Sequence, residues 1–160
     1  MIRTPSPLFS RNTSMSNPIT VQLISLAYLQ SNQTWALSLD ENGNAIIIQQ
    51  VEGPNERWTL VPNLTGTNAG YALINEGRQL SLYRPTPGGQ VQGKDMPDPY
   101  GTPDYCWVIG DPQPFLDAQT AWVIGDSNGN VLSTELDPNV FSRAWKGGNA
   151  FQQWVIKRLD

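Results

Sequence analysis

The sequence contains no histidine and only one cysteine among its 160 residues. Without histidine, the chain cannot form Ser–His or Cys–His nucleophile pairs or the usual mixed zinc sites, and it lacks the commonest general base near neutral pH. The single cysteine, Cys106, has no partner for an internal disulfide, and its place beside Trp107 favours a buried thiol over a reactive one. These absences favour a protein that is not an enzyme and needs no cofactor.

Acidic side chains are the remaining route to catalysis or metal binding. Asp95, Asp98 and Asp104 are close in sequence, but they alternate with proline and glycine, which is typical of aspartates that bond the local backbone in turns. The segments DENGN from Asp40 and DSNGN from Asp126 carry oxygen side chains at alternate positions. Neither has the glycine or the final glutamate of an EF-hand loop. The sequence therefore predicts no metal site and only a remote chance of carboxylate chemistry.

Charge is also sparse, at 15% of residues, with a net charge of −4 and scattered basic residues. Nucleic acid and anionic membranes are therefore poor partners. No segment approaches the eighteen or so apolar residues of a membrane span. Residues 1–18 are rich in Ser, Pro and Asn and lack the apolar run of a secretory signal, so we expect a disordered tail, with Met15 as an alternative start. A cytoplasmic protein, or one released without a signal peptide, fits this pattern.

No apolar stretch keeps a helical period over eleven residues, and fourteen glycines and thirteen prolines interrupt the chain. Short runs of Val, Ile, Leu and Trp lie between turn signals and predict strands. Asn-Gly pairs within residues 41–44 and 127–130 predict hairpin turns, because these residues tolerate a positive φ, and TPGG at 86–89 predicts a longer one. The chain is therefore expected to be nearly all strand.

Tryptophan recurs at an almost constant spacing. Trp58, Trp107 and Trp154 are 49 and 47 residues apart, and each precedes a run of β-branched or aliphatic residues. Leu–Ser pairs recur roughly twenty residues before them, at 37–38, 80–81 and 132–133. Segments around Tyr71 and Trp122 open the second and third units, and either VQLIS (21–25) or AYLQS (27–31) opens the first. The spacing indicates three repeats.

The number of repeats selects the fold. A propeller needs at least four blades, whereas three four-stranded units close a six-stranded barrel capped by three hairpins. The sequence therefore predicts an all-β fold, a single β-trefoil domain over residues 19–160, with pseudo-symmetric repeats at about 20–63, 68–111 and 119–160. Each repeat should bury its tryptophan in the shared core.

The last tryptophan belongs to QQW, residues 152–154, which matches the Gln-x-Trp signature of ricin-B-type β-trefoil lectins. Residues 39–60 resemble the hairpin-loop-hairpin stretch of this family, and the resemblance extends from about residue 20 to 160. It implies a carbohydrate-binding protein that recognises glycans or glycoproteins through shallow surface sites, and it is compatible with a homodimer. The sequence departs from the family where Glu56 and Tyr105 replace two glutamines, and where serines, Ser38, Ser81 and Ser133, replace a sugar-binding aspartate.

A sugar site needs an aromatic face and a few polar side chains that pair with hydroxyls. The third repeat supplies these best, since Trp145 lies nine residues before Trp154, and Asp137, Asn149 and Gln152 offer polar contacts. Trp145 is then either an exposed stacking platform or a residue packed under its own loop.

The other two repeats offer weaker sites. In the first repeat Gln49 takes the place of Trp145, which leaves Asp40, Asn55 and Glu56 without a stacking partner. The second repeat offers Tyr83, Gln92 and Tyr105 beside a longer loop, and its site is expected to be altered or inactive.

A second hypothesis is a β-trefoil protease inhibitor. The stretch at residues 84–104 is rich in proline and glycine and would form an extended surface loop, whose prolines reduce the entropy lost on binding. Such inhibitors need not keep the Gln-x-Trp motif, so its presence favours the lectin.

Overall fold

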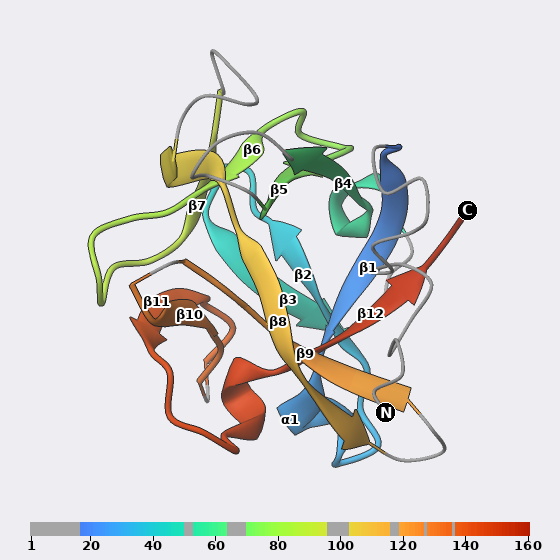
Figure 1. Ribbon diagram of the computed structural model, residues 1–160. Coiled ribbons are helices and arrows are strands. Elements are labelled where there is room, and N and C mark those ends of the chain that lie inside the picture. Colours follow the sequence, from blue (N-terminus) through green and yellow to red (C-terminus); the bar gives the residue numbers. More distant parts are fainter. Residues whose placement is uncertain are drawn as a thin grey trace.

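The computed structural model describes residues 17–49, 53–63, 70–95, 103–115, 119–126, 128–135 and 137–160 (Figure 1). The predicted tail up to residue 16, with Met15, and residues 96–102 of the proposed inhibitor loop lie outside these ranges. The described residues form twelve strands, three short 3-10 turns and one four-residue helix, α1 (Leu26–Leu29). The all-β prediction is confirmed.

Each repeat contributes four strands in the same order. The first repeat holds β1 (Ile19–Ser25), β2 (Trp35–Leu39), β3 (Ala45–Gln49) and β4 (Trp58–Asn63). The second holds β5 (Gly70–Asn75), β6 (Ser81–Tyr83), β7 (Gln92–Lys94) and β8 (Val108–Phe115). The third holds β9 (Gln119–Gly125), β10 (Asn130–Ser133), β11 (Phe141–Ala144) and β12 (Trp154–Arg158). VQLIS therefore opens the first repeat within β1, while AYLQS begins in α1.

The first and last strands of the repeats close a barrel. Antiparallel pairing runs from β12 to β1, then to β4 and β5, and from β8 through β9 back to β12. A bridge between Tyr71 and Trp107 joins β5 to the start of β8 and completes the ring. The remaining strands form three hairpins, β2–β3, β6–β7 and β10–β11 (Figure 1). This is the β-trefoil that the repeat count predicts.

The three hairpins meet in a ring of backbone hydrogen bonds. Ala45 N–H donates to the Val91 carbonyl at 2.8 Å, Val91 N–H to Val140 at 2.9 Å, and Val140 N–H back to Ala45 at 3.0 Å. All three residues are fully buried. Further backbone bonds between the hairpins surround this ring, among them those from Ile47 to Pro138, from Gly93 to Gly43 and from Ser142 to Gly89. Equivalent residues can therefore be assigned from the hydrogen bonds alone.

The three repeat tryptophans fill the core, as predicted. Trp58, Trp107 and Trp154 are at most 1% exposed. Their indole N–H groups donate to backbone carbonyls at 2.9, 3.0 and 3.2 Å, which satisfies the one polar atom that each ring buries. The acceptors are at equivalent positions, namely Leu37, Leu82 and Leu132.

The second repeat corrects the alignment of the serines. Tyr83 pairs with Gln92 as Ser133 pairs with Phe141, so Tyr83, and not Ser81, is the equivalent of Ser38 and Ser133. The sequence QLSLY has two leucines that point to the same side of a strand, because side chains alternate. The leucine pattern alone therefore fits two registers that differ by two residues.

Two similar turns occupy different places in the fold. The Asp40 carboxylate accepts from the backbone of Asn42 and Asn44, and Asp126 does the same two and four residues ahead. The glycine of each turn, Gly43 or Gly129, has φ near +85°, as the Asn-Gly pairs require (+82° and +86°). The first turn joins β2 to β3, whereas the second joins β9 to β10. The hairpin of the third repeat is therefore formed by β10 and β11, further along the chain.

Gly125 ends β9 at a point of close contact. A Cβ atom there would lie 2.5 Å from the Asn130 carbonyl oxygen and 2.8 Å from a Val131 methyl group. Gly125→Ala should therefore lower the free energy of unfolding by about 1–3 kcal/mol, as overpacking does. Urea unfolding checks this value. Gly110→Ala is the control, because nothing lies within 4 Å of its added methyl group; equal effects of the two substitutions would contradict the packing argument.

Candidate functional site

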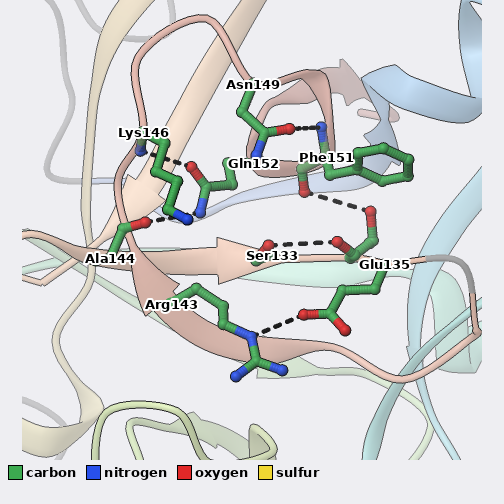
Figure 2. A pocket seen from close by; sticks show the side chains of 9 residues that line it. Ser133, Glu135, Arg143, Ala144, Lys146, Asn149, Phe151 and Gln152 are labelled. Atoms are coloured by element: carbon green, nitrogen blue, oxygen red, sulfur yellow. Dashed lines mark hydrogen bonds and ion pairs between the residues drawn. The ribbon is translucent and has the colours of Figure 1, made fainter.

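A shallow pocket of about 520 Å³ opens on the third repeat (Figure 2). It lies between the β10–β11 hairpin and the segment that leads through a 3-10 turn (Ala150–Gln152) into β12. We call it the third-repeat pocket; its lining residues are Ser133, Thr134, Glu135, Arg143, Ala144, Lys146, Asn149, Phe151 and Gln152.

Gln152 fixes the shape of this pocket. Its amide oxygen accepts from Lys146 N–H at 2.8 Å, and its amide nitrogen donates to the Ala144 carbonyl at 2.9 Å. Gln152 is only 2% exposed. Asn149 caps the adjacent turn by accepting from Phe151 N–H at 3.0 Å, which leaves its amide nitrogen toward the pocket side (Figure 2). Gln152 is therefore a support for the loop, since both of its polar atoms already have partners within the chain.

An ion pair crosses the opposite wall. Arg143 Nε donates to Glu135 Oε2 at 2.8 Å, and the guanidinium lies 4.6 Å from the centre of the Phe141 ring. The Arg143 and Glu135 side chains are 38% and 45% exposed, so the pair contributes little to stability. Its charged atoms instead remain accessible to a ligand. Tyr28 Oη donates to the Glu135 carbonyl at 2.9 Å and anchors this segment.

Phe151 provides the aromatic wall. Its ring packs edge to face against the Tyr28 ring, with 6.4 Å between the ring centres. The Tyr28 ring in turn packs against Trp35, with 5.4 Å between the ring centres. Tyr28 lies in α1, which occurs between the first two strands of the first repeat, so an insertion in that repeat supports the pocket of the third. Phe151 was not among the residues predicted from the sequence, although it directly precedes the Gln-x-Trp motif.

The structure separates the residues predicted for the third-repeat site. Asn149 and Gln152 line the pocket. Asp137 is exposed in the β10–β11 turn, where its carboxylate accepts from Asn139 N–H at 3.0 Å.

Trp145, the residue after the end of β11, lies in a second hollow of about 240 Å³. We call this the tryptophan hollow; it is lined by Val108, Gly110, Val123, Gly125, Asp126, Gly129, Val131 and Trp145.

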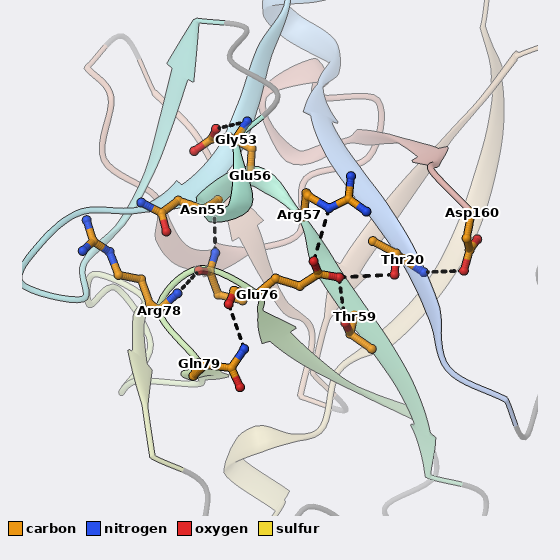
Figure 3. Close-up of polar contacts among 11 residues, drawn as sticks. Thr20, Gly53, Asn55, Glu56, Arg57, Thr59, Glu76, Arg78, Gln79 and Asp160 are labelled. Atoms are coloured by element: carbon orange, nitrogen blue, oxygen red, sulfur yellow. Dashed lines mark hydrogen bonds and ion pairs between the residues drawn. The ribbon is translucent and has the colours of Figure 1, made fainter.

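The two predicted carboxylates of the first repeat serve the fold. Glu56 is 3% exposed, and its carboxylate accepts from Gly53 N–H at 3.0 Å (Figure 3). It also accepts from Ser38 Oγ at 2.9 Å. The backbone carbonyl of Asn55 accepts from the Asn75 amide at 2.7 Å. The Asp40 carboxylate is used in its own turn, as described above.

Gln49 ends β3 and is exposed, opposite Trp35. The strand register makes it the equivalent of Ala144, one residue before Trp145.

The equivalent region of the second repeat is filled by aromatic side chains. The rings of Tyr83 and Tyr105 pack edge to face, with 5.2 Å between their centres. The Lys94 ammonium lies 4.2 Å from the centre of the Tyr83 ring. Burial, with smaller contributions from Tyr83 and nearby carboxylates, raises the pKa of Tyr105, which donates to the Asp95 carbonyl at 2.9 Å. An altered or inactive site in this repeat stays a prediction.

Cys106, expected to be buried, is half-buried, and burial raises the pKa of its thiol. Within the described residues, no group of three or more Cys, Asp or Glu side chains is placed to hold a metal ion. No helix in this part of the chain is long and apolar enough to cross a membrane.

Similarity to known proteins is seen at the level of structure. No protein-family model matches the sequence, and no curated protein matches it. The designed threefold-symmetric protein ThreeFoil has a TM-score of 0.65 and 21% identity, over 88% of this chain and 99% of that one.

Two lectins of known structure are also similar. The Macrolepiota procera ricin B-like lectin, solved in complex with lactose, has a TM-score of 0.64 and 18% identity, over 88% of this chain and 95% of that one. The Polyporus squamosus lectin, solved with a Neu5Ac-containing epitope, has a TM-score of 0.64 and 20% identity, over 88% of this chain. This chain spans 49% of that lectin's length. These likenesses establish the fold.

Proposed function

We propose that this protein is a carbohydrate-binding protein and that the third-repeat pocket holds its glycan. The observation that carries the proposal is that one open cavity combines the Phe151 ring with polar groups that are free to bind a ligand. Lectins with similar structures support it. A protein that binds without reacting also fits a sequence without histidine. Glycans, free or on glycoproteins, are the proposed partners.

The hydrogen bonds explain why we place the ligand in this repeat. In the first repeat Glu56 is buried and fully engaged, and in the second Tyr83 and Tyr105 occupy the corresponding space. In the third repeat, Ser133 is the small residue at the position of Tyr83, and a cavity remains. An aromatic edge and shallow polar walls suit a pyranose, which has both apolar and hydroxylated surfaces.

No observation on the described residues favours the protease inhibitor. At the base of the 84–104 segment, Arg84 N–H donates to the Asp104 carbonyl at 2.7 Å, and the Arg84 side chain pairs with Asp104 and Asp126. These contacts close the segment at its base.

A glycan array followed by titration of the best ligand tests the function and its location together. Phe151→Ala should weaken binding by about tenfold, the equivalent of losing one aromatic contact of about 1.4 kcal/mol. Trp145→Ala removes a larger ring from the tryptophan hollow and should leave the affinity unchanged. Thermal melts of both variants check that they are folded.

Two results would count against the proposal. If no glycan binds the native protein, the lectin function is wrong. If Trp145→Ala abolishes binding and Phe151→Ala does not, the glycan lies in the tryptophan hollow, as the spacing of the two tryptophans alone suggested.

A further inference from the structure

We infer that the third-repeat pocket selects glycans that carry an anionic group, a carboxylate or a sulfate ester. This inference rests on the proposed function and names the ligand class of the same site. It follows from the hydrogen-bonding character of the pocket, which offers more donors than acceptors.

The acceptors in the pocket are largely used by the protein. The amide oxygens of Gln152 and Asn149 accept from backbone N–H groups, and Glu135 Oε2 accepts from Arg143. Ser133 is buried, and its hydroxyl donates to the neighbouring carbonyl of Thr134 at 3.3 Å. One carboxylate oxygen, Glu135 Oε1, is left as a strong acceptor.

The donors are largely unused. Within the part of the chain that the structure describes, the Lys146 ammonium has no carboxylate within ion-pairing distance, and Arg143 pairs through Nε alone. Asn149 keeps its amide N–H groups. A sugar hydroxyl both donates and accepts, so a neutral glycan would find few partners for its protons. A carboxylate or sulfate only accepts and forms stronger, charge-assisted bonds with ammonium and guanidinium groups.

The charges of the pocket agree with this reasoning. Two cationic side chains and one carboxylate line it, although the whole chain has a net charge of −4. The pocket is therefore a locally positive region on an acidic protein. Because it is open to solvent, its attraction for an anion should weaken as salt is added.

Lys146 is held where it can meet a ligand. Its N–H donates to Gln152 at 2.8 Å, and its carbonyl accepts from Asn149 N–H at 3.2 Å. Gly147 and Gly148 follow it, and no atom lies within 4 Å of a Cβ built on either. Lys146 thus combines a hydrogen-bonded backbone with an exposed cationic side chain, whose ammonium lies on the pocket side in Figure 2.

The test uses an array of matched glycans, in which each core occurs in neutral, carboxylated and sulfated forms. The core that binds best is then titrated in all three forms at low and at physiological salt. We expect the anionic forms to bind at least tenfold more tightly than the neutral form, and the difference to shrink with salt. Comparison of the carboxylated and sulfated forms identifies which anion the site accepts.

Three variants then locate the selection. Lys146→Gln should weaken binding of the anionic form about tenfold, which corresponds to the loss of one charge-assisted bond. The affinity for the neutral form should stay unchanged. Glu135→Gln should strengthen binding of the anionic form several-fold, because it removes the negative charge of the pocket wall and weakens the hold on Arg143. Lys157→Gln, an exposed lysine of β12 outside the pocket, is the matched control and should change nothing.

The outcomes separate this inference from the proposed function. If the neutral form binds as well as the anionic forms, or if Lys146→Gln has no more effect than Lys157→Gln, anion selection is wrong while the lectin function stands. If no form of any core binds the native protein, both are wrong.

Discussion

Replacing Trp154 with alanine should lower the free energy of unfolding by about 3–5 kcal/mol, a large part of the stability of a domain of this size. The residue is fully buried, so truncation leaves a cavity among the barrel strands. It also leaves the Leu132 carbonyl without its indole donor at 3.2 Å. Urea or thermal unfolding of the purified variant measures the loss, and failure to recover folded protein is the extreme form of the same result.

Trp145→Ala is the matched control for this prediction, because it makes the same chemical change nine residues earlier. Trp145 is only partly buried in its hollow. Trp145→Ala should therefore lower the free energy of unfolding by less than half as much as Trp154→Ala. Equal losses would show that the tryptophan hollow belongs to the core and would undermine the separation of core from surface.

The second large effect concerns the residue two places before each tryptophan. Gln152→Glu should cost about 2–3 kcal/mol, because a buried carboxylate cannot donate to the Ala144 carbonyl and faces it as a second acceptor. The Lys146 N–H bond survives, since a carboxylate oxygen can still accept it. Chemical denaturation measures the loss.

Glu56→Gln is the reverse change and should cost less than about 1 kcal/mol. Both partners of Glu56 in the native chain are donors, Gly53 N–H and Ser38 Oγ. An amide oxygen still accepts from Gly53, and the Ser38 hydroxyl can rotate to accept from the new amide nitrogen. If the two substitutions were equally harmful, the donor and acceptor assignment at these sites would be wrong.

Much of the fold could be predicted because its signals are repeated. Burial requires Trp58, Trp107 and Trp154 to recur at the spacing of the structural unit, and three units allow few closed arrangements. The Asn-Gly turns could also be predicted, since few residue types fit a turn position that has a positive φ. The register within the second repeat could not be predicted in this way. Leu80 and Leu82 lie on the same side of the strand, so either of them fits the repeat pattern.

The candidate site was predicted less well, for a geometric reason. Ala144 and Trp145 are neighbours in sequence but face different hollows, and a one-residue uncertainty in the strand end exchanges them. The Arg143–Glu135 pair joins residues across the β10–β11 hairpin, and the Tyr28–Phe151 contact joins residues more than a hundred positions apart. Such contacts depend on tertiary packing, which no local pattern encodes.

The ring formed by Ala45, Val91 and Val140 makes the three repeats mutually dependent. Each N–H in the ring finds its acceptor in another repeat, so the last bond forms only when all three hairpins are in place. A chain with only two hairpins in place forms just one of the three bonds, and the remaining donor and acceptor stay hydrogen-bonded to water. Partly folded states are thereby penalised, and the domain is expected to unfold as one cooperative unit despite being built from three similar parts.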